Sequence, residues 1–293
     1  MMKRILCIAG PTASGKSAHA VKLAKKHDGE IINADALQVY GELHVLSARP
    51  SIDEMGDIPH HMFGHIDPSV RYSTGKWLVE ADALIIEILA RGKTPILVGG
   101  TGLYFKALTE GLARIPDPEP ESVRAAQTIL DTNGIERLRA EAEHLDPLAT
   151  LKVLGHDPQR LLRIVSVALG TPNPLSVWQR NTRAILPKGT WEGAVLLPKR
   201  ENLYDKINAR FEDMVRNGGL EEARRIRALS LAPDLPAMKA IGLRELIAHL
   251  DGELSLDGAI ELAMRETRRF AKRQYTWLRG QMQGWEQIEV LND

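Results

Sequence analysis

The segment GPTASGKS, residues 10–17, constrains the fold of this chain more than any other part of the sequence. It fits the pattern G-x-x-x-x-G-K-[ST], whose required setting is a buried strand before the loop and a helix after it. The apolar run RILCIA at 4–9 supplies the strand, and apolar residues along one face of 17–27 supply the helix. The sequence therefore predicts a strand–loop–helix unit near the N-terminus.

The residue types in this loop suit the binding of phosphate. Glycines at 10 and 15 let successive backbone amides point at phosphate oxygens. Lys16 adds a positive charge, and the hydroxyl of Ser17 is expected to bind Mg²⁺. We expect the whole loop to hold a phosphate ligand, that is Gly10, Pro11, Thr12, Ala13, Ser14, Gly15, Lys16 and Ser17. The pattern leaves open which phosphate compound binds.

Strand and helix patterns alternate along much of the chain. Further strands are predicted over 30–34, 94–98 and 194–198, with helical patterns between and after them. This order is typical of an α/β fold in which helices flank a parallel sheet, here of the P-loop NTPase-like kind.

A mostly helical insert is expected to interrupt this core. The proline- and acid-rich run IPDPEPES at 115–122 indicates a boundary, and a helical pattern with no strand candidate follows it. We therefore predict that residues 116–189 form an insertion domain. Residues 1–115 and 190–293 would together form the core.

Composition limits the classes of function. Lys+Arg and Asp+Glu both total 38, so overall charge does not indicate a nucleic-acid partner and any basic surface must be local. The single cysteine, Cys7, excludes an internal disulfide and a cysteine-rich zinc site. The sequence contains no apolar run of about 18 residues and no signal-peptide pattern. We therefore expect a cytoplasmic protein without membrane contact, most simply a monomer.

Two polar residues follow predicted strands, at the edge where open parallel sheets bind their ligands. Asp35 follows the strand at 30–34, and Thr101 follows the strand at 94–98. We expect both residues, with Gln38, to line the same cleft as the phosphate loop. The residues alone leave three roles open for Asp35: metal ligand, base, or cap of a turn.

Several longer patterns occur together in a characteristic order. They are GPTASGKS at 10–17, D-x-x-QVY at 35–40, PHH at 59–61, ILVGGTGLYFKAL at 96–108, DPQR-x-x-R at 157–163, AIGLREL at 240–246 and TRRFAKRQYTWLR at 267–279. The first is a general loop, whereas GGTGLY and AKRQ-x-TW are quite specific. Over nearly its whole length the chain resembles the tRNA dimethylallyltransferases, also called tRNA isopentenyltransferases. The absence of cysteine from its C-terminal part resembles the bacterial type.

The resemblance implies a reaction. A dimethylallyl group moves from dimethylallyl diphosphate to the exocyclic N6 amine of the adenosine on the 3′ side of the tRNA anticodon, and diphosphate leaves. The phosphate loop would hold the diphosphate, with Mg²⁺ as cofactor. By the same resemblance Asp35 is the general base, Thr101 bonds the base region and the leaving group, and Arg210 contacts the diphosphate.

The resemblance also implies contacts with the anticodon stem-loop of tRNA. The stretch around an extruded adenine comprises Asp35, Ala36, Leu37, Gln38 and Thr101. Contacts from the insert are Val123, Gln159, Arg160, Leu161, Leu162 and Arg163. Ala36 and Leu37 depart from the Ser and Arg that family members usually carry, so the resemblance implies no detailed contact at these two positions.

A predicted helix near the C-terminus supports an RNA substrate independently. Arg265, Arg268, Arg269 and Lys272 have the spacing of one helix face. A basic face of this kind suits tRNA, and a merely solvated face is the alternative. His60, His61 and His65 invite a metal interpretation, but nearby prolines and a glycine argue against a helical site, and we expect them to shape a loop over the cleft.

Three other functions share parts of this pattern. A small-molecule kinase also uses a phosphate loop, but usually adds a strand-end Asp for Mg²⁺, and the strand at 94–98 ends without an acid. An adenylate (AMP) isopentenyltransferase would need neither the insert nor the basic helix. A non-catalytic RNA-binding module would not need an intact phosphate loop.

Overall fold

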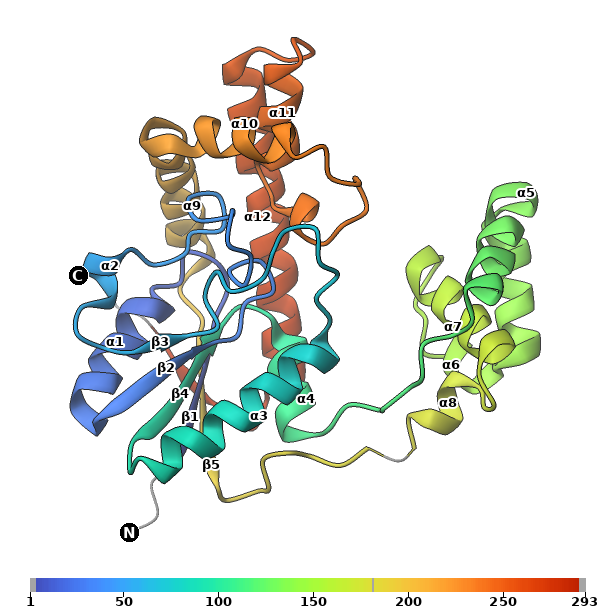
Figure 1. Cartoon of the computed structure of the whole chain (residues 1–293), viewed down its shortest axis with the longest axis horizontal. Coiled ribbons are helices and arrows are strands. Elements are labelled where there is room, and N and C mark those ends of the chain that lie inside the picture. Colours follow the sequence, from blue (N-terminus) through green and yellow to red (C-terminus); the bar gives the residue numbers. More distant parts are fainter. Residues whose placement is uncertain (1–3, 181, 290–293) are drawn as a thin grey trace. The chain divides into compact units, whose positions relative to one another are not determined.

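A six-stranded sheet forms the centre of the larger of two structural units (Figure 1). The structure, a computed structural model, describes residues 4–180 and 182–289. The strand order is β3-β2-β4-β1-β5-β6, and every neighbouring pair is parallel. The strands are β1 (Ile5–Ala9), β2 (Gly29–Asn33), β3 (His60–His61), β4 (Thr94–Gly99), β5 (Trp191–Leu196) and β6 (Glu286–Ile288). The predicted α/β class is confirmed.

The two outermost strands were not predicted. Strand β3 contains two residues, and β6 contains three, too few to show an alternating pattern. His60 and His61 belong to β3 and pair with Ile31 and Ile32 of β2, so the expectation that they lie in a loop over the cleft is wrong. His61 bonds the buried Glu30 through Nε2 at 2.7 Å, which ties the sheet edge together.

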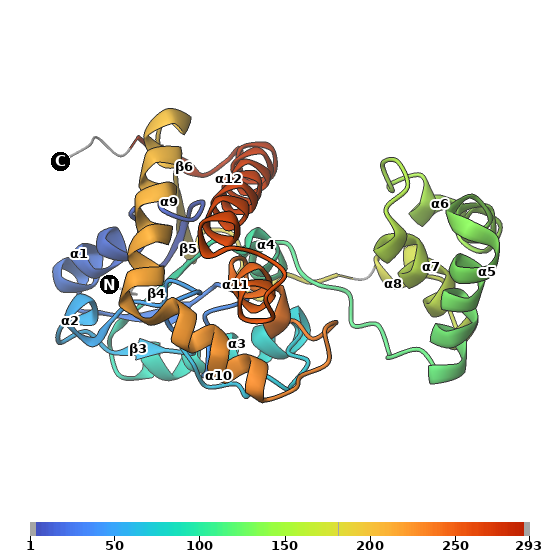
Figure 2. The same ribbon diagram turned by 90° about the horizontal axis from the view of Figure 1, so that it is seen from above.

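Helices cover both faces of the sheet (Figures 1 and 2). On one face, Ala20 and Ala24 of α1 (Lys16–His27) pack against Ile8, Ile31 and Ile96. The other face is covered by α3 (Thr74–Ala90) and α4 (Gly102–Thr109). Their aromatic rings Trp77 and Tyr104 stack with centroids 4.2 Å apart, and Trp77 Nε1 donates to the backbone oxygen of Asn33 at 2.8 Å. A short helix, α2 (Ile52–Met55), precedes β3.

A helical layer follows β5. Helices α9 (Arg200–Met214) and α12 (Leu256–Gln281) pack side by side (Figure 2). Between them the chain forms α10 (Leu220–Ala228) and α11 (Leu243–Leu250), which contact each other, and α11 also contacts α12. The layer includes a single π-helical turn at Val215–Gly219 and a 3₁₀ turn at Ala237–Lys239.

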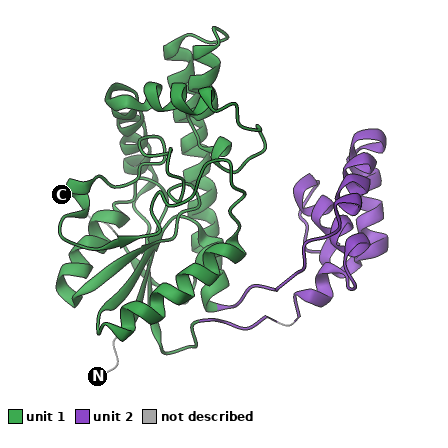
Figure 3. Cartoon of the chain, in the orientation of Figure 1, with its two compact units in different colours: residues 1–109, 186–293 green, residues 110–185 purple. Residues whose placement is uncertain are grey.

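The smaller unit comprises residues 110–185 (Figure 3). It is helical, with a core of its own in which Leu138, Leu161 and Val165 are fully buried. Its boundaries, at 109/110 and 185/186, lie several residues before the predicted ones at 115/116 and 189/190. Its helices are α5 (Pro120–Leu145), α6 (Pro147–Thr150), α7 (Pro158–Gly170) and α8 (Leu175–Trp178).

No helix within the described ranges, 4–180 and 182–289, combines the length and apolarity needed to cross a bilayer.

Candidate active site

The phosphate loop occupies the carboxyl end of β1, where the chain turns sharply into α1. Gly15 precedes α1 with φ 81°, a left-handed conformation that glycine adopts without steric cost. A Cβ on Gly10 would lie 2.6 Å from Ser14 Oγ, so the loop closes too tightly for a side chain there. Ala13 also has a positive φ, 63°, which is uncommon outside glycine. These conformations turn the loop around the space in front of α1.

Lys16 is the central cation of the loop. Its Nζ donates to the backbone oxygen of Pro11 at 3.3 Å. Burial lowers the pKa of Lys16 to about 8, Asp35 opposes this shift and Arg210 adds to it. An anionic ligand would stabilise the charged ammonium group. The charge of Lys16 is therefore only partly balanced by Asp35, and an anionic ligand would balance the rest.

Asp35 begins the turn that follows β2. Its backbone N–H donates to Asn33 Oδ1 at 2.9 Å, and its Oδ1 accepts from the N–H of Leu37 at 2.9 Å. The capping role considered from the sequence is thus present. The second oxygen, Oδ2, faces Gly100, where a Cβ would lie 3.4 Å from it. One oxygen orders the turn, and the other is available for chemistry.

Thr101 joins the ends of two strands. Its Oγ1 accepts from the N–H of Ala36 at 3.0 Å, and its own N–H donates to the oxygen of Ala34 at 3.2 Å. The backbones approach so closely that a Cβ on Gly99 would lie 1.9 Å from the oxygen of Ala34. This close approach explains why the GGTGLY motif has glycine here. It also brings Thr101 and Asp35 to one edge of the site.

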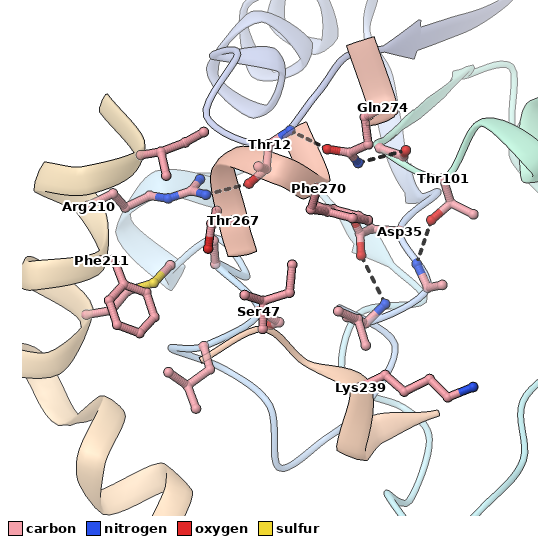
Figure 4. Close-up of a pocket in the computed structure, with 18 of the residues that line it drawn as sticks. Thr12, Asp35, Ser47, Thr101, Arg210, Phe211, Lys239, Thr267, Phe270 and Gln274 are labelled. Carbon is pink, nitrogen blue, oxygen red and sulfur yellow. Dashed lines mark hydrogen bonds between the residues drawn. The ribbon is translucent and has the colours of Figure 1, made fainter. Parts of the chain in front are cut away.

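Two cavities meet at this edge. The larger, about 740 Å³, is lined by the phosphate loop from Thr12 to Ala18 and by Asp35, Gln38 and Arg210. The smaller, about 410 Å³, has a mainly apolar lining that includes Leu37, Phe211 and Phe270 (Figure 4). Both cavities are lined by Thr12, Asp35, Ser47, Ala48, Arg210 and Met214. Asp35 thus lies where the cavity lined by the phosphate loop adjoins the apolar cavity.

Arg210 reaches this junction from α9. Its guanidinium donates to Thr12 Oγ1, which places it against the phosphate loop (Figure 4). Burial lowers the pKa of Arg210, and Asp35 opposes the shift. The structure thus brings together Lys16, Arg210, Asp35 and Thr101, which lie far apart in the sequence.

Gln274 of α12 was not predicted as a site residue, although it lies in the AKRQ-x-TW motif. Its Oε1 accepts from the N–H of Thr12 at 2.9 Å, and its Nε2 donates to the oxygen of Gly100 at 2.9 Å (Figure 4). The side chain is 8% exposed and lines the apolar cavity. It joins the phosphate loop to the GGTGLY segment, and the specificity of its motif was the signal that could have found it.

The predicted tRNA contacts of the insert lie in the smaller unit. Val123, on α5, is 47% exposed and shares a hollow of about 410 Å³ with Leu162 and Arg163. Gln159 and Arg160 are exposed at the start of α7. Leu161 is fully buried in the core of this unit, so its side chain is not presented to a ligand.

The predicted basic face lies on α12. Arg265, Arg269 and Lys272 are exposed, and Glu266 pairs with Arg269 at 2.6 Å. Arg268 is half-buried and donates to Asn208 Oδ1 at 2.5 Å. The face is therefore basic, but part of its charge is already paired.

A family model described as IPP transferase matches residues 38–281, which is most of the chain. The chain belongs to the IPP transferase family. A second model, described as Isopentenyl transferase, matches residues 3–60, which contain the phosphate loop and Asp35. The resemblance inferred from the motifs is confirmed.

Full-length relatives of this IPP transferase carry a more specific name. The tRNA dimethylallyltransferase of Caulobacter sp. (strain K31) is 50% identical over 98% of this chain and 93% of its own length. That of Maricaulis maris (strain MCS10) is 50% identical over 99% of this chain and 94% of its own length. The similarity thus covers both structural units.

Solved structures agree with this family assignment. The tRNA isopentenylpyrophosphate transferase of Bacillus halodurans has a TM-score of 0.69 at 30% identity, covering 98% of this chain and 90% of that chain. A eukaryotic dimethylallyltransferase described as acting on tRNA has a TM-score of 0.84 at 27% identity, covering 98% of this chain and 74% of that chain. The sheet and helices described above are therefore those of known prenyltransferases.

Proposed function

We propose that this IPP transferase moves a dimethylallyl group from dimethylallyl diphosphate to the N6 amine of the adenosine on the 3′ side of a tRNA anticodon. One observation carries the proposal: Asp35 lines both the cavity of the phosphate loop and the apolar cavity beside it. A donor with an anionic head and an apolar tail suits such a pair of spaces. The full-length relatives named tRNA dimethylallyltransferase support this substrate pair over a kinase or an AMP prenyltransferase.

The larger cavity is assigned to the diphosphate. Lys16 and Arg210 approach this space from two elements, α1 and α9, and both are half-buried. Desolvation lowers the pKa of each, so their charges are less screened than in water. Charge that develops on the leaving oxygens is stabilised there by groups already in place. Thr12 is held by both Arg210 and Gln274, which orders this part of the loop before the donor binds.

The residues around the loop fit a magnesium ion. The hydroxyl of Ser17 lines the same cavity as Lys16, and a hard oxygen donor of this kind suits Mg²⁺ together with phosphate oxygens. When bound, the ion would neutralise charge on the departing diphosphate. Ser17 would hold it, as the sequence predicts for this loop position.

The transfer exchanges one bond for another. The bond between C1 of the dimethylallyl group and the diphosphate oxygen breaks, its electron pair leaves with the diphosphate, and a bond from N6 to C1 forms. The proton released from N6 passes to a carboxylate oxygen of Asp35. A positioned base contributes roughly 10²–10⁴-fold to such a rate. Thr101 fixes the turn that carries Asp35 through its bond to Ala36.

The tRNA side of the site is assigned to two groups of residues, one in the core and one in the insert. We assign contacts with the extruded adenosine to the turn Asp35–Gln38 and contacts with the anticodon stem-loop to the insert, through Val123, Gln159, Arg160 and Arg163. We also propose that the chain acts as a monomer.

A transfer assay tests the proposal. Donor labelled in the dimethylallyl group is incubated with the chain, Mg²⁺ and unmodified tRNA, and the modified nucleoside is identified after digestion. Parallel reactions offer AMP as acceptor or ATP as donor. Label on N6 of the adenosine next to the anticodon supports the proposal. Label on AMP alone, or phosphate transfer from ATP, would overturn it.

A further inference from the structure

Glu222 of α10 is a fully buried carboxylate outside the site described above, with an exposed fraction of 0%. It accepts hydrogen bonds from three consecutive backbone amides: from His44 at 3.0 Å, from Val45 at 2.7 Å and from Leu46 at 2.9 Å. These bonds are charge-assisted and short, as the burial of a carboxylate requires. Its charge also opposes the lowering of the Arg49 pKa that burial causes.

The segment that Glu222 holds, residues 44–48, forms part of the wall of the active site. Ser47 and Ala48 line both cavities. Their backbone oxygens accept from Gln38 Nε2, at 3.1 Å and 2.8 Å. Since both N–H donors of this carboxamide are engaged, its orientation is fixed and its oxygen remains as the acceptor. Gln38 itself lines the larger cavity, three residues after Asp35.

The 44–48 segment does not adopt a relaxed conformation. Ala48 has φ 53°, a left-handed conformation that L side chains disfavour, and such a residue persists where its surroundings hold it. The π-helical turn brings α10 against this segment. A Cβ on Gly219 would lie 3.3 Å from Leu46 Cδ2, so the turn packs closely against this segment.

We propose that Glu222 is a positioning residue for prenyl transfer. It fixes the 44–48 segment and, through Ser47 and Ala48, the carboxamide of Gln38 beside the path of the target adenosine. Gln38 also lines the larger cavity, but it belongs to the turn that we assign to the adenosine. The three bonds of Glu222 lie on the segment that orders Gln38 and none lies on the phosphate loop, so its effect is larger for tRNA than for the donor. This role rests on the proposed function, and Glu222 acts in it through Gln38.

The Glu222→Gln variant tests the inference in the full chain. It keeps the size of the side chain but loses its charge and one acceptor oxygen. We expect kcat/KM for tRNA to fall about tenfold, while KM for dimethylallyl diphosphate changes less than about threefold. Glu221→Gln is the matched control, because Glu221 is the exposed neighbour on the same helix, 3.8 Å from Arg224. It is expected to behave as the wild type.

A double variant separates positioning from general stability. If Glu222 acts through Gln38, Glu222→Gln combined with Gln38→Met loses little beyond Gln38→Met alone. Gln38→Met removes the bonds from Gln38 to Ser47 and Ala48, so it should show the same selective loss even if Glu222→Gln folds poorly. Losses that multiply, or equal losses for tRNA and donor, would overturn the proposal. A wild-type chain with no transfer activity would instead overturn the proposed function.

Discussion

The α/β core and the helical insert differ in how their polar groups are placed. In the core, most polar groups around the two cavities are buried or half-buried, and several are hydrogen-bonded to one another, as in the links of Gln274 to Thr12 and Gly100. In the insert, Gln159 and Arg160 are exposed at the start of α7, over a core that is purely structural. Bond-making needs atoms held in place before the substrate arrives, whereas recognition of a large RNA needs accessible charge and shape. The comparison predicts large, selective effects in the core and small, additive effects in the insert.

The largest effect is expected from Asp35→Asn. Asn retains an oxygen that can accept from the N–H of Leu37, so the turn is preserved while the base is removed. Single-turnover rates should fall roughly 10²–10⁴-fold. Donor and tRNA affinities, measured by equilibrium binding, should stay close to those of the wild type. Full activity in this variant would remove Asp35 from the role of base.

Lys16→Ala should weaken donor binding roughly ten- to hundredfold, because a half-buried, charge-assisted contact to the diphosphate is lost. The affinity for tRNA should change much less, and equal losses would contradict the assignment. The wild-type pH profile adds a test, since the pKa of Lys16 is lowered to about 8. Below this value the ammonium group is charged, so donor affinity should decrease as the pH rises through about 8. This decrease should be absent from the variant.

Gln274 should show an intermediate effect. Gln274→Leu leaves the N–H of Thr12 and the oxygen of Gly100 without their partner, and we expect kcat/KM for the donor to fall about tenfold. Gln274→Glu keeps the acceptor for Thr12 but places a negative charge beside the phosphate site, so it should bind the donor less well than Gln274→Leu. Donor binding close to that of the wild type in Gln274→Leu would show that Gln274 contributes only packing, and the reverse order would show that the acceptor for Thr12 outweighs the added charge.

The smallest effects are expected in the insert. Arg160→Ala and Arg163→Ala should each weaken tRNA binding severalfold and reduce the slope of log affinity against log salt by about one. Donor affinity should not change. Arg227→Ala is a control on the core, because Arg227 is half exposed and pairs with Asp251 on the surface. A salt slope that is unchanged in both insert variants would remove these arginines from the interface.

How far the sequence could predict the molecule differs between its parts. The phosphate loop and the strand-end residues Asp35 and Thr101 could be predicted, because a local motif and the geometry of parallel strands place them at one edge. Gln274 and Glu222 could not, because their partners lie 174 or more residues away and a single polar residue on a helix shows no periodic signal. Strands β3 and β6 were missed because two or three residues cannot show alternation.

The central claim is that the diphosphate lies on the phosphate loop while the dimethylallyl carbon faces Asp35. A crystal structure of the chain with Mg²⁺ and a thio analogue of the donor that cannot transfer its prenyl group tests this most directly. We predict diphosphate oxygens within hydrogen-bonding distance of the loop amides and Arg210, with C1 of the prenyl group directed toward the carboxylate of Asp35. A diphosphate bound away from Lys16, or a prenyl group directed away from Asp35, would contradict the account.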